Sequence, residues 1–325
     1  MRGKIISLFT TEQHLSVLAA NDCNVLAAAA YCDIAPRGIT VSRQLVKYWR
    51  LIYRDGAKPR AGVANNIMRK ARRLKDADPL GIGGLYNPKQ VYNCILVIPD
   101  QHSPYQHQDT LAFLAHVASQ FNPELVVNLG DETDKHAMSF HDSDPNLMSA
   151  GDELEAAKVF LAALAKLFPN QLVCDSNHGS MHFRKAKAHG IPVQYLKSYR
   201  DVLFPDGGGE GWEWAENWRV NTPLGPVMFK HQASGPILVD AAHNQCNLMV
   251  GHEHSKFEIS YTASSAAIYW GAYSGCLVNK DSLAFAYGKH FPRKPVIGCT
   301  VILNGCPMLI PMLMGTDGRW KGAKK

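Results

Sequence analysis

The stretch YNCILVIPDQH, residues 92–102, joins an apolar, strand-like run to a polar cluster. Two further apolar runs, at residues 125–129 and 172–174, also end in polar residues. Helix-like stretches lie between these runs, at residues 110–121 and 151–168. Alternating strand and helix segments are typical of a layered α/β domain, which is the fold class that we predict.

Five polar clusters follow apolar runs along the chain. They are Asp100-Gln101-His102, Gly130-Asp131-Glu132-Thr133-Asp134, Asp175-Ser176-Asn177-His178, His231 and Gly251-His252-Glu253-His254. Ligands of open α/β sheets collect at the carboxyl ends of strands, so we expect the clusters to converge. Carboxylate and imidazole together suit Mn²⁺, Fe or Zn²⁺. One Asp-x-His is more often structural than functional, but five clusters supply enough ligands for two metal ions and a bridging group.

Charge is unevenly distributed along the chain. Residues 1–90 carry 15 Lys+Arg against 6 Asp+Glu, a net of +9, whereas residues 91–325 carry 19 against 22, a net of −3. Histidine divides the other way, with His14 alone in the first part and 13 histidines in the second. This division predicts a polyanion-binding end and a chemical end.

The basic segment is predicted to be helical between residues 10 and 75. Along the helix expected from Arg43 to about Tyr53, four cations recur at spacings of 4, 3 and 4 and therefore share one face: Arg43, Lys47, Arg50 and Arg54. A second cluster consists of Arg69, Lys70, Arg72, Arg73 and Lys75. With the turn around Gly38, the arrangement resembles a helix-turn-helix and predicts binding to DNA phosphates. The alternative is a solvated basic face on a bundle that only packs against the rest of the chain.

The expected organisation has three parts. Residues 1–78 form a basic helical domain, residues 79–90 form a linker rich in glycine and proline, and residues 91–325 form the α/β domain. The sequence cannot fix the oligomeric state.

The composition argues against a secreted or membrane protein. No secretory signal is visible at the start of the sequence. The longest uncharged run, residues 295–316, contains Asn304-Gly305 between two apolar stretches, which predicts a hairpin of buried strands. The eight cysteines include no CxxC pair and several lie in apolar runs, so we expect reduced thiols and a cytoplasmic location.

In order, the five clusters resemble the five motifs of the calcineurin-like metallophosphoesterase superfamily, over roughly residues 91–310. The resemblance implies a four-layer α/β/β/α sandwich, preceded here by the small all-α domain. It also implies two divalent transition-metal ions, with Mn²⁺ as the first choice and Fe or Zn²⁺ as alternatives.

The resemblance implies a role for each residue of the motifs. Asp100, His102 and His254 would hold the first ion, and Asn177, His231 and His252 would hold the second, with Asp131 as the bridge. His178 would act beside the scissile phosphate as a proton donor or a cation. Asp134 would orient its imidazole.

The sequence departs from the pattern of the superfamily at four positions. Ser176 replaces a glycine, and Gly179 replaces the carboxylate that usually follows the Asn-His pair. Gln232 rather than glycine follows His231, and Lys135 stands where phosphoprotein phosphatases have arginine. None of these changes removes a proposed ligand, and the last one weakens a protein-phosphatase interpretation.

Several neighbouring residues have two interpretations. His182, Arg184 and His136 can contact substrate, or they can belong to the surface around the site. The tryptophans at 212, 214 and 218 can stack on a base, although aromatic packing is the more common role of such residues.

The leading hypothesis is a two-metal phosphodiesterase that hydrolyses nucleic acid, DNA above all. The analogy is with metallophosphoesterases of bacteriophages and with DNA-repair exonucleases of the SbcD type, which would place the protein in the host cytoplasm. The alternatives are a phosphatase or small-nucleotide phosphodiesterase, and a catalytically weak DNA-binding protein on the same scaffold.

Overall fold

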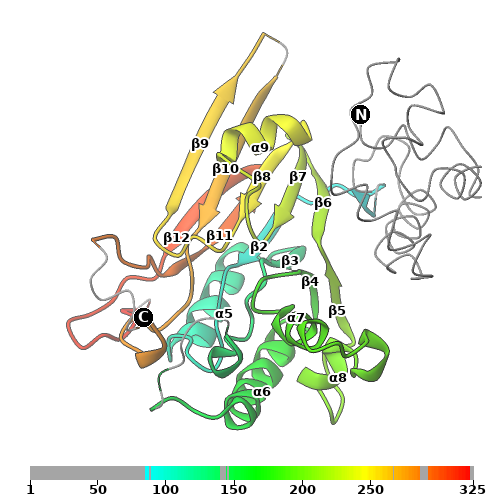
Figure 1. The fold of residues 1–325 in the computed structure, drawn as a ribbon. Helices are drawn as coiled ribbons and strands as arrows, with labels where there is room; N and C mark the ends of the chain where they lie inside the picture. Colours follow the sequence, from blue (N-terminus) through cyan, green and yellow to red (C-terminus); the bar gives the residue numbers. More distant parts are fainter. Residues whose placement is uncertain are drawn as a thin grey trace, which may run out of the picture. The chain divides into compact units, whose positions relative to one another are not determined.

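The structure is a computed structural model that describes residues 85–322 except 88, 140–143, 145, 266 and 286–291 (Figure 1). The predicted all-α domain and both basic clusters lie outside the described residues. In the described part the strands form two six-stranded sheets.

Sheet A has the strand order β1-β6-β7-β8-β10-β9. Its strands are β1 (Leu85–Tyr86), β6 (Asn217–Thr222), β7 (Gly225–Lys230), β8 (Asn247–Val250), β10 (Ile268–Ser274) and β9 (Phe257–Ala263). The first of them lies inside the expected linker and pairs in parallel with β6, so this part of the linker belongs to a sheet.

Sheet B has the strand order β12-β11-β2-β3-β4-β5. Its strands are β12 (Cys306–Pro311), β11 (Gly298–Leu303), β2 (Cys94–Ile98), β3 (Leu125–Asn128), β4 (Asn170–Cys174) and β5 (Gly211–Ala215). The three strands predicted first, β2, β3 and β4, are parallel neighbours, because helical crossovers join them.

The helices are α5 (Thr110–Phe121), α6 (Ala150–Leu167), α7 (Met181–Ala188), α8 (Tyr199–Leu203) and α9 (Ile237–Asn244), with 3₁₀ turns η2 (His136–Met138) and η3 (Val193–Tyr195). Both crossover helices, α5 and α6, agree with the predicted ranges. Ser149 caps α6 by accepting a hydrogen bond from the amide of Asp152, at 3.2 Å, and acidic residues fill the first turn.

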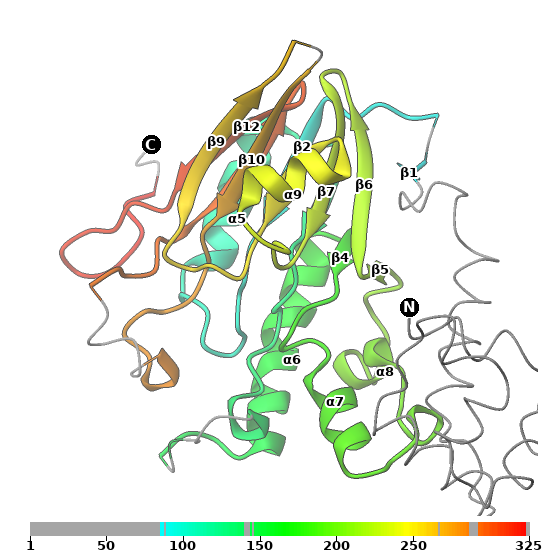
Figure 2. The ribbon, with the colours of Figure 1, turned by 45° about the horizontal axis from the view of Figure 1, so that its top comes forward.

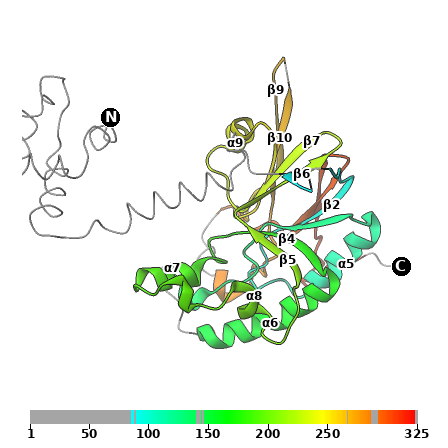
Figure 3. The ribbon, with the colours of Figure 1, turned by 90° about the vertical axis from the view of Figure 1, so that its right-hand side faces the viewer.

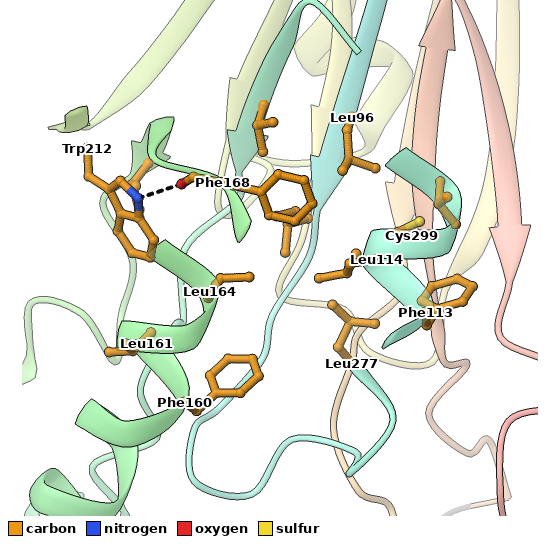
Figure 4. Close-up of a cluster of buried hydrophobic side chains, with 14 of the residues drawn as sticks. Leu96, Phe113, Leu114, Phe160, Leu161, Leu164, Phe168, Trp212, Leu277 and Cys299 are labelled. Atoms are coloured by element: carbon orange, nitrogen blue, oxygen red, sulfur yellow. Dashed lines mark hydrogen bonds between the residues drawn. The ribbon is translucent and has the colours of Figure 1, made fainter. Parts of the chain in front are cut away.

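The elements stack in four layers, helix–sheet–sheet–helix (Figures 2 and 3). β2 shows why its sequence is uniformly apolar: Leu96 and Ile98 face a core shared with α5 and α6, whereas Ile95 and Val97 face sheet A. A strand buried on both faces has no polar side to expose. Figure 4 shows the core beneath the helices, where the Trp212 indole N–H donates to the Phe168 carbonyl at 3.0 Å.

The opposite outer layer is α9, which packs on β8 and β10. Gly271 allows this close approach, because a β-carbon there would lie 2.7 Å from Cγ1 of Ile237. The layered α/β architecture predicted from the sequence is therefore confirmed for the described residues.

Two smaller predictions are also confirmed. β11 and β12 form the antiparallel hairpin around Asn304 and Gly305, although only β11 is buried as expected, whereas β12 is largely exposed or half-buried. The six cysteines in the described part of the chain are free thiols, and all except Cys306 are buried. No helix among the described residues is long and apolar enough to cross a membrane.

Candidate metal centre

The five polar clusters meet at the carboxyl ends of strands from both sheets. Asp100, Asp131 and Asn177 follow β2, β3 and β4 of sheet B, whereas His231 and His252 follow β7 and β8 of sheet A. The sandwich therefore brings together side chains that lie up to 154 residues apart, as in the contact of Asp100 with His254.

The first group of donors consists of Asp100, His102 and His254, whose ligand atoms lie within 4.8 Å of one another. Nε2 of His254 is 3.2 Å from Oδ2 of Asp100 and 3.1 Å from Nε2 of His102. All three residues were expected to share one ion, and the structure brings them together.

The second group consists of Asn177, His231 and His252. Nε2 of His231 is 2.6 Å from Oδ1 of Asn177 and 3.2 Å from Nδ1 of His252. These are also the three residues that were expected to share the other ion.

Asp131 lies between the two groups. Its Oδ2 atom is 3.4 Å from Nε2 of His102 and 3.3 Å from Nε2 of His231. The side chain is buried, and each group can reach the same carboxylate. This is the position that a bridging ligand needs.

The arrangement of the donor atoms suits bound metal ions. Ring nitrogens of His102 and His254 face each other at 3.1 Å, and those of His231 and His252 face each other at 3.2 Å, as nitrogens that share a cation would. Oδ1 of Asp100 is buried and has no hydrogen-bond partner. A buried acceptor without a partner is costly, and a cation bound by the Asp100 carboxylate would offset that cost.

The other ring nitrogens are held in place by the fold. Nδ1 of His102 is 2.6 Å from a carboxylate oxygen of Asp134, and Nδ1 of His231 is 2.9 Å from the carbonyl oxygen of Leu129. A partner on one nitrogen fixes the ring and leaves the other nitrogen for a metal. Both Nε2 atoms consequently point into the site.

The electrostatics of the site favour positive charge. Burial by itself raises the pKa of Asp131, but His231, His178 and His102 outweigh it and hold that pKa well below its usual value. Burial opposes the charged form of His102, yet Asp131 and Asp134 raise its pKa well above the usual value. Ionised carboxylates that stabilise positive charge on neighbouring imidazoles would also stabilise bound metal cations.

The backbone is specialised around these ligands. His102, Asp131 and His252 all have positive φ angles, of 51°, 49° and 65°, which non-glycine residues seldom adopt. A β-carbon on Gly251 would lie 2.3 Å from Oδ1 of Asp100, so glycine is needed there. Such conformations cluster at functional sites, where the surrounding structure enforces them.

His178 lies beside the first group, and its ring contacts that of His102 with centroids 4.6 Å apart. The expected role of Asp134 needs correction. Its carboxylate lies 3.8 Å from Nδ1 of His178, too far for a hydrogen bond, and binds His102 instead. Nδ1 of His178 bonds to the backbone carbonyl of Asp134. Asp134 thus orients the imidazole of His102 through its carboxylate and that of His178 through its backbone carbonyl.

Ser176 and Gly179, two of the four positions that depart from the motifs, have clear structural roles. The hydroxyl of Ser176 accepts hydrogen bonds from the amides of Asp131 and Gly179, each at 2.9 Å. A side chain at Gly179 would begin 2.7 Å from that hydroxyl and 3.8 Å from Oε2 of the buried Glu132. A carboxylate at 179 would therefore meet a like charge.

The three residues expected to contact substrate, His182, Arg184 and His136, are not among the residues that line the metal pocket. The first two lie in α7 and the third lies in η2. Nδ1 of His182 is 3.3 Å from the amino group of Lys135, and Arg184 donates to the carbonyl of Asn177. The ring of His136 accepts from the amide of Asp144 at 3.3 Å. Each of the three side chains therefore contacts other groups of the protein near the site.

The pocket over the two groups measures about 580 Å³ and includes residues that the sequence did not single out. Phe285 packs edge-on against His102, with centroids 5.6 Å apart. Lys280, Arg293 and Lys294 add positive charge to its lining. No motif marks these residues, because they enter the site only through the loops after β10.

Comparison with known proteins gives structural likeness only. No protein-family model and no curated protein matches the chain. Among solved structures, Vacuolar Protein Sorting 29 from Cryptosporidium parvum is similar at 10% identity and a TM-score of 0.36, over 68% of this chain and 87% of that chain. Chaetomium thermophilum Vps29 gives 12% and 0.34, over 71% and 93%. The phosphoesterase YfcE from E. coli gives 12% and 0.34, over 70% and 95%.

Proposed function

We propose that the protein is a metal-dependent phosphodiesterase that hydrolyses nucleic acid, with DNA as its substrate. The observation that carries the proposal is the position of Asp131, 3.4 Å and 3.3 Å from histidines of two separate donor groups. Asp100, His102 and His254 would hold one divalent ion, and Asn177, His231 and His252 the other. Mixed carboxylate, amide and imidazole donors suit Mn²⁺, Fe or Zn²⁺.

Two bound dications would lower the pKa of a bound water and offset the charge of the transition state. The side chains of the chain supply the remaining functions. His178 faces the pocket, and its Nδ1 is held by the carbonyl of Asp134, so the doubly protonated ring can pass its Nε2 proton to the leaving oxygen. Lys280 and Arg293 line the same pocket and can attract a phosphate chain.

Charge supports nucleic acid as the substrate. Residues 1–90 carry a net charge of +9, and the cations of the predicted helix at 43–53 share one face. Counterion release would make binding to DNA strong at low salt and weak at high salt. The free thiols of the described residues fit a reducing compartment such as the cytoplasm.

The proposal is tested by cleavage assays on supercoiled, linear and single-stranded DNA with Mn²⁺, Zn²⁺ or chelator. We expect cleavage with a transition metal and none with chelator. Bis-p-nitrophenyl phosphate serves as a small diester and p-nitrophenyl phosphate as the matched monoester. Hydrolysis of the small diester with intact DNA would contradict the nuclease assignment, and preference for the monoester would indicate a phosphatase.

A further inference from the structure

A second cavity of about 510 Å³ opens on the other side of the turn that carries Asn177 and His178. It lies where β3, β4 and β5 end and where α7 and α8 begin. Its lining includes Glu132, Ser176, Gly179, Phe183, Tyr199 and Trp214. Crevices at the carboxyl ends of strands are the usual ligand sites of α/β sheets.

The two cavities share one short turn. Asn177 lines the metal pocket and Gly179 lines the second cavity. These residues are two positions apart, so their Cα atoms are separated by at most about 7.6 Å. The metal pocket and the second cavity therefore adjoin one another along this turn.

The walls of the second cavity include aromatic rings that contacts with neighbouring side chains hold in place. The rings of Tyr199 and Trp214 meet edge to face, with centroids 5.9 Å apart. The Arg200 guanidinium lies 5.9 Å from the Trp214 ring and donates to the carbonyl of Trp212 at 2.8 Å. Trp214 is the one tryptophan of the three that lines a cavity, since the indoles of Trp212 and Trp218 donate to carbonyls of the core.

Glu132 supplies the buried polar group of the cavity. Glu132 is 1% exposed, and its Oε1 atom accepts a hydrogen bond from the indole N–H of Trp214 at 3.2 Å. The Tyr199 hydroxyl also hydrogen-bonds this carboxylate, and since a carboxylate has about four acceptor positions, further donors can still bind it. A buried acceptor beside flat aromatic walls suits a planar ring that carries N–H groups.

We propose that the second cavity binds a nucleobase next to the scissile phosphate, stacked on the aromatic wall and donating N–H groups to Glu132. The inference rests on the proposed phosphodiesterase function. Guanine is the preferred base, because its ring N–H and amino group lie side by side and can both reach one carboxylate. A site built around such a bond discriminates strongly against bases that lack the donors.

The experiment compares p-nitrophenyl esters of guanosine and thymidine monophosphate with bis-p-nitrophenyl phosphate, which has no base. The readout is the ratio of kcat/KM for the guanosine ester to kcat/KM for the base-free diester. We expect this ratio to fall about tenfold or more in Glu132→Gln and in Trp214→Leu. Glu213→Gln, an exposed neighbour on β5, is the matched control and should keep the wild-type ratio. An unchanged ratio in both cavity variants would overturn the proposal.

Binding separates this inference from the catalytic proposal. Tryptophan fluorescence of the full chain is titrated with guanosine monophosphate and with ribose 5-phosphate. Tighter binding of the nucleotide, weakened in Trp214→Leu, supports the base site even if no diester is hydrolysed. Equal affinity for the two compounds would refute the base site even if the diester is hydrolysed.

Discussion

The amino group of Lys135 donates to the backbone carbonyl of His178 at 2.9 Å, and it donates to that of Gly179 at 2.7 Å. The lysine is buried, and its amino group also lies 4.3 Å from the centroid of the Tyr199 ring. Lys135 stands where phosphoprotein phosphatases have arginine, but here it braces the turn that carries the candidate proton donor. We regard it as a positioning residue.

Lys135→Met should lower kcat for the small diester by about 10- to 100-fold, because a misplaced catalytic group loses its alignment. KM should change little, and Lys135→Arg should restore part of the rate by donating to the same carbonyls. Steady-state kinetics of the two variants measure this. A rise in KM at constant kcat would instead identify Lys135 as a substrate contact.

His178→Ala should lower kcat by about 10²- to 10⁴-fold, the usual contribution of a general acid. Its metal content should match that of the wild type, because His178 is expected to act on the leaving oxygen. His189→Ala, at an exposed position after α7, is the control and should retain full activity. Metal analysis decides the matter: loss of an ion in His178→Ala would make His178 a ligand.

Metal ions should stabilise the fold, since a ligand that binds only the native state adds about 2.7 kcal/mol at 100 times its Kd. We expect Mn²⁺ to raise the thermal midpoint of the metal-free protein. Asp131→Asn should lose most of that rise, because the bridge serves both ions. Calorimetry with and without metal tests this, and an unchanged rise in the variant would remove Asp131 from the site.

Stability should also depend on the ion pair between Asp109 and Arg319. The hydrogen bond from Arg319 is the main cause that lowers the pKa of Asp109 to about 2, from an ordinary 3.8. The folded state therefore holds this proton less tightly than the unfolded state does. The pair stabilises the fold above about pH 4, and that contribution is lost as the pH falls from about 4 to about 2.

The comparison with Asp109→Asn isolates this effect. Urea unfolding should show the wild type to be more stable near neutral pH, with the difference shrinking across that acid window. A difference that stays constant from pH 6 to pH 2 would show that the ion pair is not its source.

The basic residues of the first segment should govern binding to DNA. The triple change Arg43→Ala, Lys47→Ala and Arg50→Ala should weaken binding and flatten its dependence on salt, by about 0.9 in slope for each lost contact. Lys158→Ala with Lys166→Ala, on α6, is the control. Binding titrations from low to moderate salt measure the slopes, and equal slopes would move the interface elsewhere.

The sequence alone predicted the strands β2, β3 and β4, the two crossover helices and the polar clusters that hold the seven candidate ligands. These features are local: an apolar run followed by Asp or His specifies a buried strand and the residue at its end. The Asn304-Gly305 turn is local for the same reason, and β11 and β12 pair around it.

Only the tertiary structure decided how neighbouring side chains divide their roles. Asp134 pairs with His102 and not with His178, Lys135 turns toward backbone carbonyls, and Trp214 faces a cavity whereas Trp212 lies in the core. Each of these contacts depends on which atoms of another helix or strand lie within about 3 Å, because hydrogen bonds weaken steeply with distance and misalignment. Spacing along the chain carries no such information, because the partners come from separate strands and helices.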